Sequence, residues 1–443
     1  MKQSMGKLLM VGAVLASPSV KANIFFEDDK LSVMNRNFLF YRDFKKGGYN
    51  PSGANVNVPV SEKEGYRNEW AQGLVVNYFS GYSSGELKFG FDLYGLLGIK
   101  LYSDPYKTGT NLLQIDSEGN AKDAYGEIGG ALKLKYKNTV LTYGNQFPNN
   151  PIIATSTIRL LPSVSTGVTI QNTDLENLLF DAGYFYKMNP VDSTRHLNYF
   201  TTDYGMGIKA DSISYIGAKF KKDSTSIQAY ASELEDVWNQ YYLGIDYTKP
   251  LGNGQKAKVS FSNYSTKSTG AEKGGEIESH MAAASLSYTL NNHSFLVGYQ
   301  QVFGSEPFDY VGFSTVGSNA YVANATQYAT FSEAHEKSLQ LKYDLDLSPY
   351  GIPGLSFMTR YVYGWDIDNT HSNNNFYTKR FVYNQDIDHR HWERDFQIGY
   401  KVQDGFAKNL DIKLRQATHR STAGYRYVPL DEIRLIVEFP LSL

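Results

Sequence analysis

The sequence predicts an all-β protein, a transmembrane antiparallel barrel, and three observations support this prediction. Segments in which apolar and polar residues alternate recur along most of the 443 residues, as expected for strands with lipid on one face and water on the other. The chain begins with a basic and then apolar segment typical of secreted proteins. No later segment holds the roughly 20 apolar residues that a membrane-spanning helix needs. Because only helices and closed barrels satisfy every backbone group in lipid, a membrane location requires a barrel.

The first 22 residues have the pattern of a secretory signal peptide. Lys2 and Lys7 precede an apolar run over residues 8–16, and a Val-Lys-Ala stretch ends at Ala22. We expect cleavage after Ala22, which leaves residues 23–443 as one barrel domain. Cleavage would remove Lys2, Lys7 and Lys21, so the formal net charge falls from −2 to −5. This acidic balance argues against nucleic acid as a partner.

Composition fits the same fold class. Tyrosine (35) and phenylalanine (25) supply most of the aromatic residues, which suits rings placed at the two membrane interfaces. The mean hydropathy of −0.40 is low for a helical membrane protein but compatible with a barrel that has a polar interior. The chain has no cysteine, which excludes disulfides, thiol catalysis and thiolate metal sites.

The last segment shows the alternation most clearly. Its apolar face carries Ile433, Leu435, Val437 and Phe439, and the opposite face carries Glu432, Arg434, Ile436 and Glu438. Similar alternation covers residues 132–137, 338–347, 355–364, 396–403 and 410–415. Short turns such as Asn291-Asn292 and long polar loops separate these segments, as in outer-membrane barrels. The mature chain accommodates on the order of 16 to 18 strands of about 10 residues each.

Particular motifs indicate a family. They include Arg36-Asn-Phe-Leu-Phe-Tyr-Arg-Asp43, Glu69-Trp-Ala-Gln-Gly73, Arg159-Leu-Leu-Pro162, Pro307-Phe-Asp-Tyr310 and Tyr350-Gly-Ile-Pro-Gly354. With these motifs in order, the mature chain resembles the OprD family of outer-membrane porins. The resemblance implies a monomeric 18-stranded barrel in the outer membrane of Gram-negative bacteria, in contact with lipid and lipopolysaccharide. It also implies a lumen narrowed by inward-folded loops and passive uptake of small polar solutes, chiefly carboxylates such as amino acids, with no cofactor, metal or enzymatic activity.

A ladder of basic side chains along one lumen wall is a further implication of the resemblance. The matching positions are Arg36, Arg42, Lys135, Arg360, Lys413 and Arg415. Strand alternation independently places several of these on lumen faces and adds Lys401 and Arg434, although Arg434 is expected to pair with Glu432 or Glu438. A guanidinium can hold a carboxylate through two hydrogen bonds, so the set forms a candidate solute-binding site. The alternative is that these charges merely solvate an open lumen.

Two long segments are expected to narrow the lumen. Residues 145–166, which contain Arg159, resemble the family's third loop. In the second segment, Asp309 and Tyr310 are candidates to face the basic wall and orient a zwitterion; the alternative is that they pack against the barrel. The stretch over residues 317–321 lacks the acid that the family carries after a glycine-rich tip, which argues against a preference for cationic solutes.

Other functions have weaker support. A hydrolase would need a nucleophile beside a histidine, but no Gly-x-Ser-x-Gly motif occurs. A structural barrel or adhesin would need a plugged lumen. His389 and His391 could share a strand face and bind a metal, but we expect this segment to be an exposed loop that leads into a strand.

Overall fold

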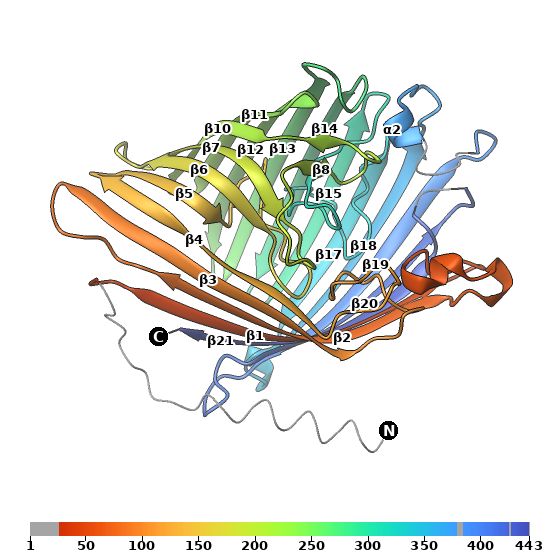
Figure 1. Ribbon diagram of the computed structural model, residues 1–443, viewed down its shortest axis with the longest axis horizontal. Coiled ribbons are helices and arrows are strands. Elements are labelled where there is room, and N and C mark those ends of the chain that lie inside the picture. The colour runs from red at the N-terminus through yellow and green to blue at the C-terminus, as the bar shows by residue number, and fades with distance from the viewer. Residues whose placement is uncertain (1–25, 379–383, 425–426, 443) are drawn as a thin grey trace.

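The computed structural model describes residues 26–378, 384–424 and 427–442, and its architecture is a closed antiparallel barrel (Figure 1). The signal peptide lies outside the described residues, so its cleavage stays a prediction. The described part forms an 18-stranded sheet. Its strands are β1 (Lys30–Phe44), β2 (Tyr66–Phe79), β3 (Leu87–Tyr102), β4 (Ala124–Tyr136), β5 (Thr139–Gln146), β6 (Val164–Asn172), β7 (Leu178–Asn189), β10 (Ile213–Lys222), β11 (Thr225–Leu234), β12 (Trp238–Gly252), β13 (Gln255–Ser268), β14 (Glu278–Leu290), β15 (His293–Phe303), β17 (Lys337–Asp346), β18 (Leu355–Ile367), β19 (His389–Lys401), β20 (Asp411–Ser421) and β21 (Leu430–Ser442). Strand β1 pairs with both β2 and β21, which closes the sheet.

Few other elements occur in the described part of the chain. They are the 3-10 turns η1 (Gly53–Asn57), η2 (Val60–Glu62) and η3 (Ser348–Tyr350), the single helical turn α2 (Asn375–Thr378), and a small sheet of β8 (Phe200–Thr202), β9 (Lys209–Ala210) and β16 (Val311–Gly312). No helix among these residues is long and apolar enough to cross a membrane. The prediction of an all-β barrel of about 18 strands is confirmed.

Side chains alternate between the two faces of the wall as the sequence predicted. On β17, Leu339 and Leu341 are 41% and 50% exposed on the outer face, whereas Ser338 and Gln340, which alternate with them, are buried on the lumen side. The apolar outer face suits lipid, and the polar inner face suits water and the loops that fold inward.

The two ends of the barrel differ in the length of their connections. At one end, two-residue turns join β4 to β5, β10 to β11 and β14 to β15. Their first residues, Lys137, Asp223 and Asn291, have φ of 49°, 47° and 53°, which matches the hairpin turns that fit the twist of antiparallel strands. The long loops, including residues 147–163, 190–212 and 304–336, lie at the other end.

The loop of residues 147–163 reaches opposite walls of the lumen. Near its start, Ile152 and Ile153 belong to a buried cluster that contains wall residues of β10 to β15. Near its end, Leu160 and Leu161 belong to a second cluster with Phe38 and other residues of β1 and β3. The loop therefore crosses the lumen, and burial of its apolar side chains, worth roughly 1.5–3 kcal/mol for each large one, holds it there.

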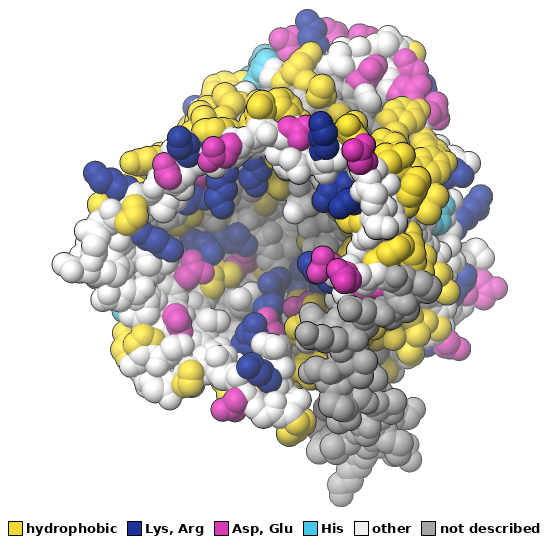
Figure 2. Space-filling view, turned by 90° about the vertical axis from the view of Figure 1, so that its left-hand side faces the viewer, with side chains coloured by type: hydrophobic (Ala, Val, Ile, Leu, Met, Phe, Trp, Pro, Cys, Tyr) yellow, Lys and Arg dark blue, Asp and Glu magenta, His cyan; other side chains and the backbone are white. Residues whose placement is uncertain are grey.

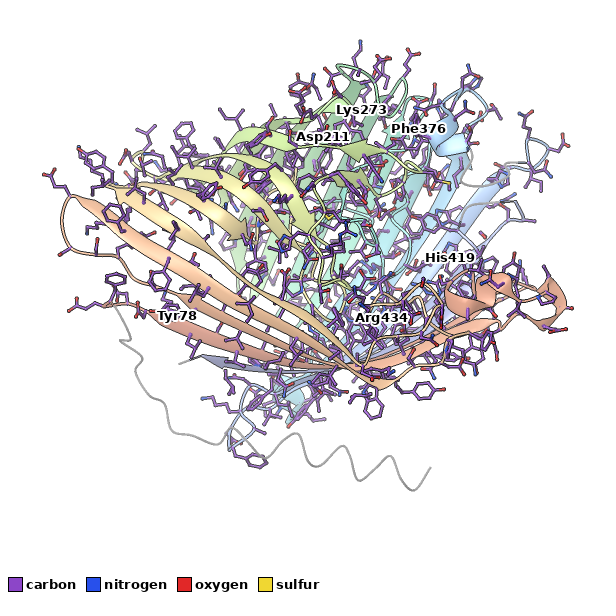
Figure 3. All side chains as sticks on the ribbon, in the orientation of Figure 1. Tyr78, Asp211, Lys273, Phe376, His419 and Arg434 are labelled. Carbon is purple, nitrogen blue, oxygen red and sulfur yellow. The ribbon has the colours of Figure 1, made fainter. Side chains whose placement is uncertain are left out.

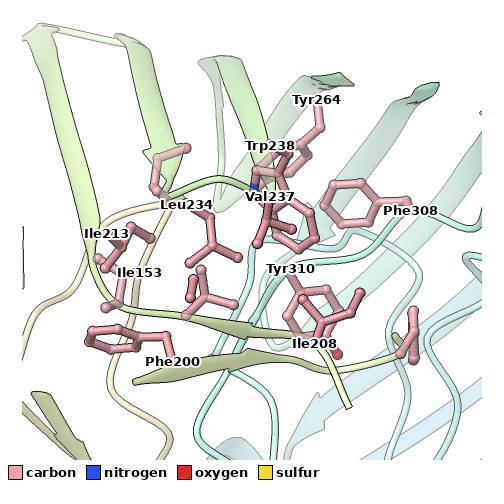
Figure 4. Close-up of a cluster of buried hydrophobic side chains, with 14 of the residues drawn as sticks. Ile153, Phe200, Ile208, Ile213, Leu234, Val237, Trp238, Tyr264, Phe308 and Tyr310 are labelled. Atoms are coloured by element: carbon pink, nitrogen blue, oxygen red, sulfur yellow. The ribbon is translucent and has the colours of Figure 1, made fainter. Parts of the chain in front are cut away.

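The first cluster also anchors the other two inward loops (Figure 4). Phe200 and Ile208 come from residues 190–212, and Phe308 and Tyr310 come from residues 304–336. The Phe308 ring lies 4.6 Å from that of Tyr264 on β13. Three loops thus share one apolar anchor on the wall, and the expectation that inward-folded loops narrow the lumen is confirmed.

Candidate solute-binding site in the lumen

The narrowed part of the lumen holds a cavity of about 620 Å³. One wall comes from the strands β1 and β18 to β21, and the other comes from the three inward loops. Five arginines line it: Arg42, Arg159, Arg360, Arg415 and Arg434. Figure 2 looks into the barrel from the end with the short turns and shows Lys and Arg side chains lining the hollow interior.

Strand register places three of these arginines on the adjacent strands β20, β21 and β1. Arg415 on β20 lies directly opposite Arg434 on β21, and Arg434 is labelled inside the barrel in Figure 3. Arg42 on β1 lies opposite Glu432, two residues from Arg434 on the same strand face. Like charges directly opposite one another destabilise a sheet, so the Arg415–Arg434 pair costs stability unless an anion is close by.

The guanidinium groups of three of these arginines lie around one phenyl ring. The carbons at the centres of the Arg42, Arg159 and Arg434 guanidinium groups lie 5.2, 5.4 and 4.6 Å from the centroid of the Phe40 ring. Phe40 is fully buried on β1. A cation within about 6 Å of an aromatic face is attracted to it, so Phe40 offsets part of the repulsion among the three cations.

Arg159 is the arginine that the loop of residues 147–163 contributes. Its Nε donates to the carbonyl of Thr110 at 2.8 Å, which ties two loops together. Burial, and then the nearby Arg434 and Arg42 cations, lower the pKa of Arg159 to about 9. The side chain is still a cation at neutral pH, but it lies among like charges and an anion would stabilise it.

Three of the five arginines form ion pairs with acids of the wall. Arg42 contacts Glu432 at 2.6 Å, and Arg434 contacts the same carboxylate at 2.5 Å. Arg360 pairs with Asp395, with its Nε 3.1 Å from the carboxylate. Arg434 therefore pairs with Glu432, one of the two partners expected from the strand face, and it also lines the cavity.

Hydroxyl and carboxylate groups of the loops face the cavity from the other side. Tyr310 lines it, and its hydroxyl donates to Asp203 at 3.1 Å. Asp203, Tyr204 and Tyr427 also line it. A solute in the cavity thus meets guanidinium groups on the strand wall and at Arg159. On the loop side it meets tyrosine hydroxyl groups and the carboxylate of Asp203.

The remaining residues of the predicted ladder lie away from this cavity. Arg36 pairs with Glu438 at 2.7 Å and donates to carbonyls of the loop at residues 157, 159 and 160. Lys413 contacts Asp411 and Glu438 at 2.8 and 3.1 Å. Lys135 lies over the ring of Tyr82, and Lys401 is exposed at the end of β19 next to a turn. Whether these four residues contact a solute stays a prediction.

Of the two placements considered for Asp309, the structure shows a packed side chain and not one that faces the basic wall. Its carboxylate is only 2% exposed and accepts hydrogen bonds from the backbone N–H groups of residues 203, 204, 205 and 310, at 2.8 to 3.0 Å. The hydroxyl of Tyr377 donates to it at 3.1 Å. Burial raises the pKa of Asp309, and these donors offset part of that cost. Asp309 therefore holds two loops together.

The placement of His389 and His391 in an exposed loop is wrong. Both are buried on the lumen face of β19. The His391 Nδ1 lies 2.9 Å from the Nε2 of His419, which Figure 3 labels on β20, and its Nε2 lies 2.6 Å from the Glu336 carboxylate. No group of metal-binding side chains is found among residues 26–378, 384–424 and 427–442.

Comparison with known proteins identifies the family. The family model described as "outer membrane porin, OprD family" matches residues 23–443. The chain belongs to the OprD family of outer-membrane porins. It is 37% identical over 440 residues to Porin D of Pseudomonas aeruginosa, which covers 98% of this chain and 95% of that protein.

Similarity to solved structures supports the family assignment. OccK9 (OpdG) of Pseudomonas aeruginosa aligns with a TM-score of 0.83 and 31% identity, over 94% of this chain and 99% of that one. OpdK of the same species, in a structure with vanillate, aligns with a TM-score of 0.81 and 28% identity over the same shares. The protein is therefore a porin-like barrel of the Gram-negative outer membrane.

Proposed function

We propose that the protein is a passive diffusion channel for small polar solutes that bear a carboxylate, such as amino acids or other organic acids. The convergence of five arginines on one cavity in the narrowed lumen carries this proposal. A water-filled pore through a low-dielectric layer disfavours ions, and fixed charges of opposite sign draw a solute in. Vanillate, present in the OpdK structure, is itself a carboxylate.

The other basic residues extend a path along the strands. Arg36 and Lys413 lie nearer the turn end than the cavity arginines of their own strands, and Lys135 and Lys401 lie at that end. A solute released from the cavity would meet these charges in turn, and weak repeated binding lets it leave as well as enter. We also propose that the channel acts as a monomer and has no enzymatic activity, as the family resemblance implies.

Single-channel conductance in a planar bilayer tests the proposal. We expect discrete openings that benzoate interrupts in a concentration-dependent manner, because its carboxylate binds the arginines. Benzamide has nearly the same shape without the charge and should interrupt far less. If both molecules block equally, the pore discriminates by size alone. If purified protein gives no openings, the channel proposal fails, and a plugged barrel or an enzyme takes its place.

A further inference from the structure

The five cavity arginines are not equivalent. We propose that a permeating carboxylate is bound by Arg159 and Arg415, whereas Arg42, Arg360 and Arg434 are structural cations that hold a loop segment in place. This inference rests on the proposed function, because it assigns the solute to two residues of the same cavity.

The loop segment concerned is residues 325–329, here called the strap, of which residues 325–328 line the cavity. Arginines of the wall bind its carbonyl groups: Arg360 donates to the carbonyl of residue 325 at 2.7 Å, and Arg434 donates to that of Gln327 at 3.0 Å. The strap has no strand partner of its own in the described structure, so these donors satisfy partly buried backbone groups that no strand pairs.

Acids of the wall bind the N–H groups of the same strap. Glu393 accepts from the N–H groups of residues 328 and 329 at 2.8 and 2.9 Å, and Asp395 accepts from that of Gln327 at 3.2 Å. Glu432 accepts from the Gln327 side chain at 2.9 Å. All three acids are at most 1% exposed. The strap is therefore clamped by alternating cations and anions from β18, β19 and β21.

Arg360 and Arg434 bind the strap directly, and a third arginine, Arg42, pairs with Glu432 and lies 4.8 Å from the ring centroid of Tyr328 in the strap. A solute carboxylate at Arg360 would compete with Asp395 for the guanidinium, and displacing Asp395 would leave a buried carboxylate without its cation. Such a loss is costly, because an unpaired buried charge keeps its full desolvation penalty. The same argument applies to Arg42 and Arg434, which share Glu432.

Arg415 and Arg159 are differently placed. Neither forms an ion pair with any described residue. The Arg415 Nε donates to the Gln397 side chain at 2.7 Å, and no described residue accepts a hydrogen bond from its two terminal nitrogens. Arg159 uses its Nε and one terminal nitrogen on carbonyl groups of residues 110 and 158. A guanidinium has five N–H donors, so both side chains keep donors for a carboxylate in the cavity.

The test compares block by benzoate in variants of the full-length channel. In Arg415→Gln and in Arg159→Gln, the dissociation constant for block should rise about tenfold or more, because a charge-assisted hydrogen bond is lost. The second arm of the test is the double variant Arg360→Gln with Asp395→Asn, which removes a whole ion pair and so leaves neither partner as an unpaired buried charge. It should change block by less than about threefold, but should add conductance substates as the strap loosens.

The outcomes separate the two proposals. Loss of block in the double variant, with block retained in Arg415→Gln, would overturn the assignment while leaving the carboxylate channel intact. Wild-type channels that benzoate does not block would overturn the proposed function itself. If Arg415→Gln does not insert as a folded barrel, Arg415→Lys can be used instead. It keeps the charge but cannot hold a carboxylate through two parallel hydrogen bonds as a guanidinium does. Block in that variant should be weakened but measurable, and unchanged block would refute a role for the two hydrogen bonds of the guanidinium.

Discussion

Replacing Arg36 by alanine is expected to loosen the loop that carries Arg159. Although Arg36 is part of the predicted ladder, its guanidinium points into the loop and contacts the carbonyls of residues 157, 159 and 160. It also pairs with Glu438, which keeps a second cation, Lys413, when Arg36 is lost. The variant therefore removes a support of the loop without leaving an acid wholly unpaired.

The size of the effect follows from these contacts. Only the bond to the carbonyl of residue 159 is short, at 2.5 Å, while the other two are 3.3 and 3.4 Å. One good hydrogen bond from a charged donor contributes about 1.5–3 kcal/mol. A loss of about 2 kcal/mol raises the fraction of displaced loop roughly 30-fold, since each 1.36 kcal/mol is a factor of ten.

Single-channel recordings measure this fraction directly. A displaced loop widens the lumen, so Arg36→Ala should spend roughly 30 times longer than wild type in a state of larger conductance. Lys413→Ala is the matched control, because it removes the other cation of Glu438 and touches no loop carbonyl in the described structure. The reasoning is refuted if Arg36→Ala shows no added state, or if Lys413→Ala behaves in the same way.

Three other changes test separate parts of the structure. Phe40→Leu should weaken block by benzoate several-fold, because the cation–π contact that helps to position Arg159, worth about 0.5–1 kcal/mol, is lost, whereas Phe38→Leu, which removes a neighbouring ring, should not. Asp309→Asn should increase conductance noise, because one acceptor for four backbone N–H groups is weakened, but should leave the block constant unchanged; an altered block constant would place Asp309 at the solute. Raising the salt concentration from 0.1 to 1 M shortens the Debye length from about 10 to 3 Å and should weaken block strongly, and a block that is insensitive to salt would contradict an electrostatic site.

Strand alternation was sufficient to predict the wall. It assigned Leu339 and Leu341 to lipid and Ser338 and Gln340 to the lumen, because the two-residue period of a strand fixes the face of every side chain. The same rule placed Arg360 and Arg415 on the lumen side. It could not show that Arg360 is paired and Arg415 is not, since Asp395 and Gln397 are assigned to them by the register between strands.

Strand alternation could not predict the conformation of the loops. No periodicity marks Gln327 or Tyr328 as part of a clamped strap, or Asp203 as a cavity residue, because loop conformation depends on contacts between segments far apart in the chain. The two placements of Asp309 could not be told apart for this reason: its role depends on backbone N–H groups about a hundred residues earlier. Alternation did place Arg434 on the lumen face, and the structure shows that it also lines the cavity.

The measurement that tests the central claim most directly is the release of radiolabelled solutes from lipid vesicles that contain the purified protein. Gluconate and sorbitol are close in size and neither crosses lipid readily, but only gluconate bears a carboxylate. The account predicts faster release of gluconate at low concentration, and loss of that advantage in Arg415→Gln. Release of sorbitol at an equal or higher rate would show that the arginines do not select carboxylates, and would contradict the account.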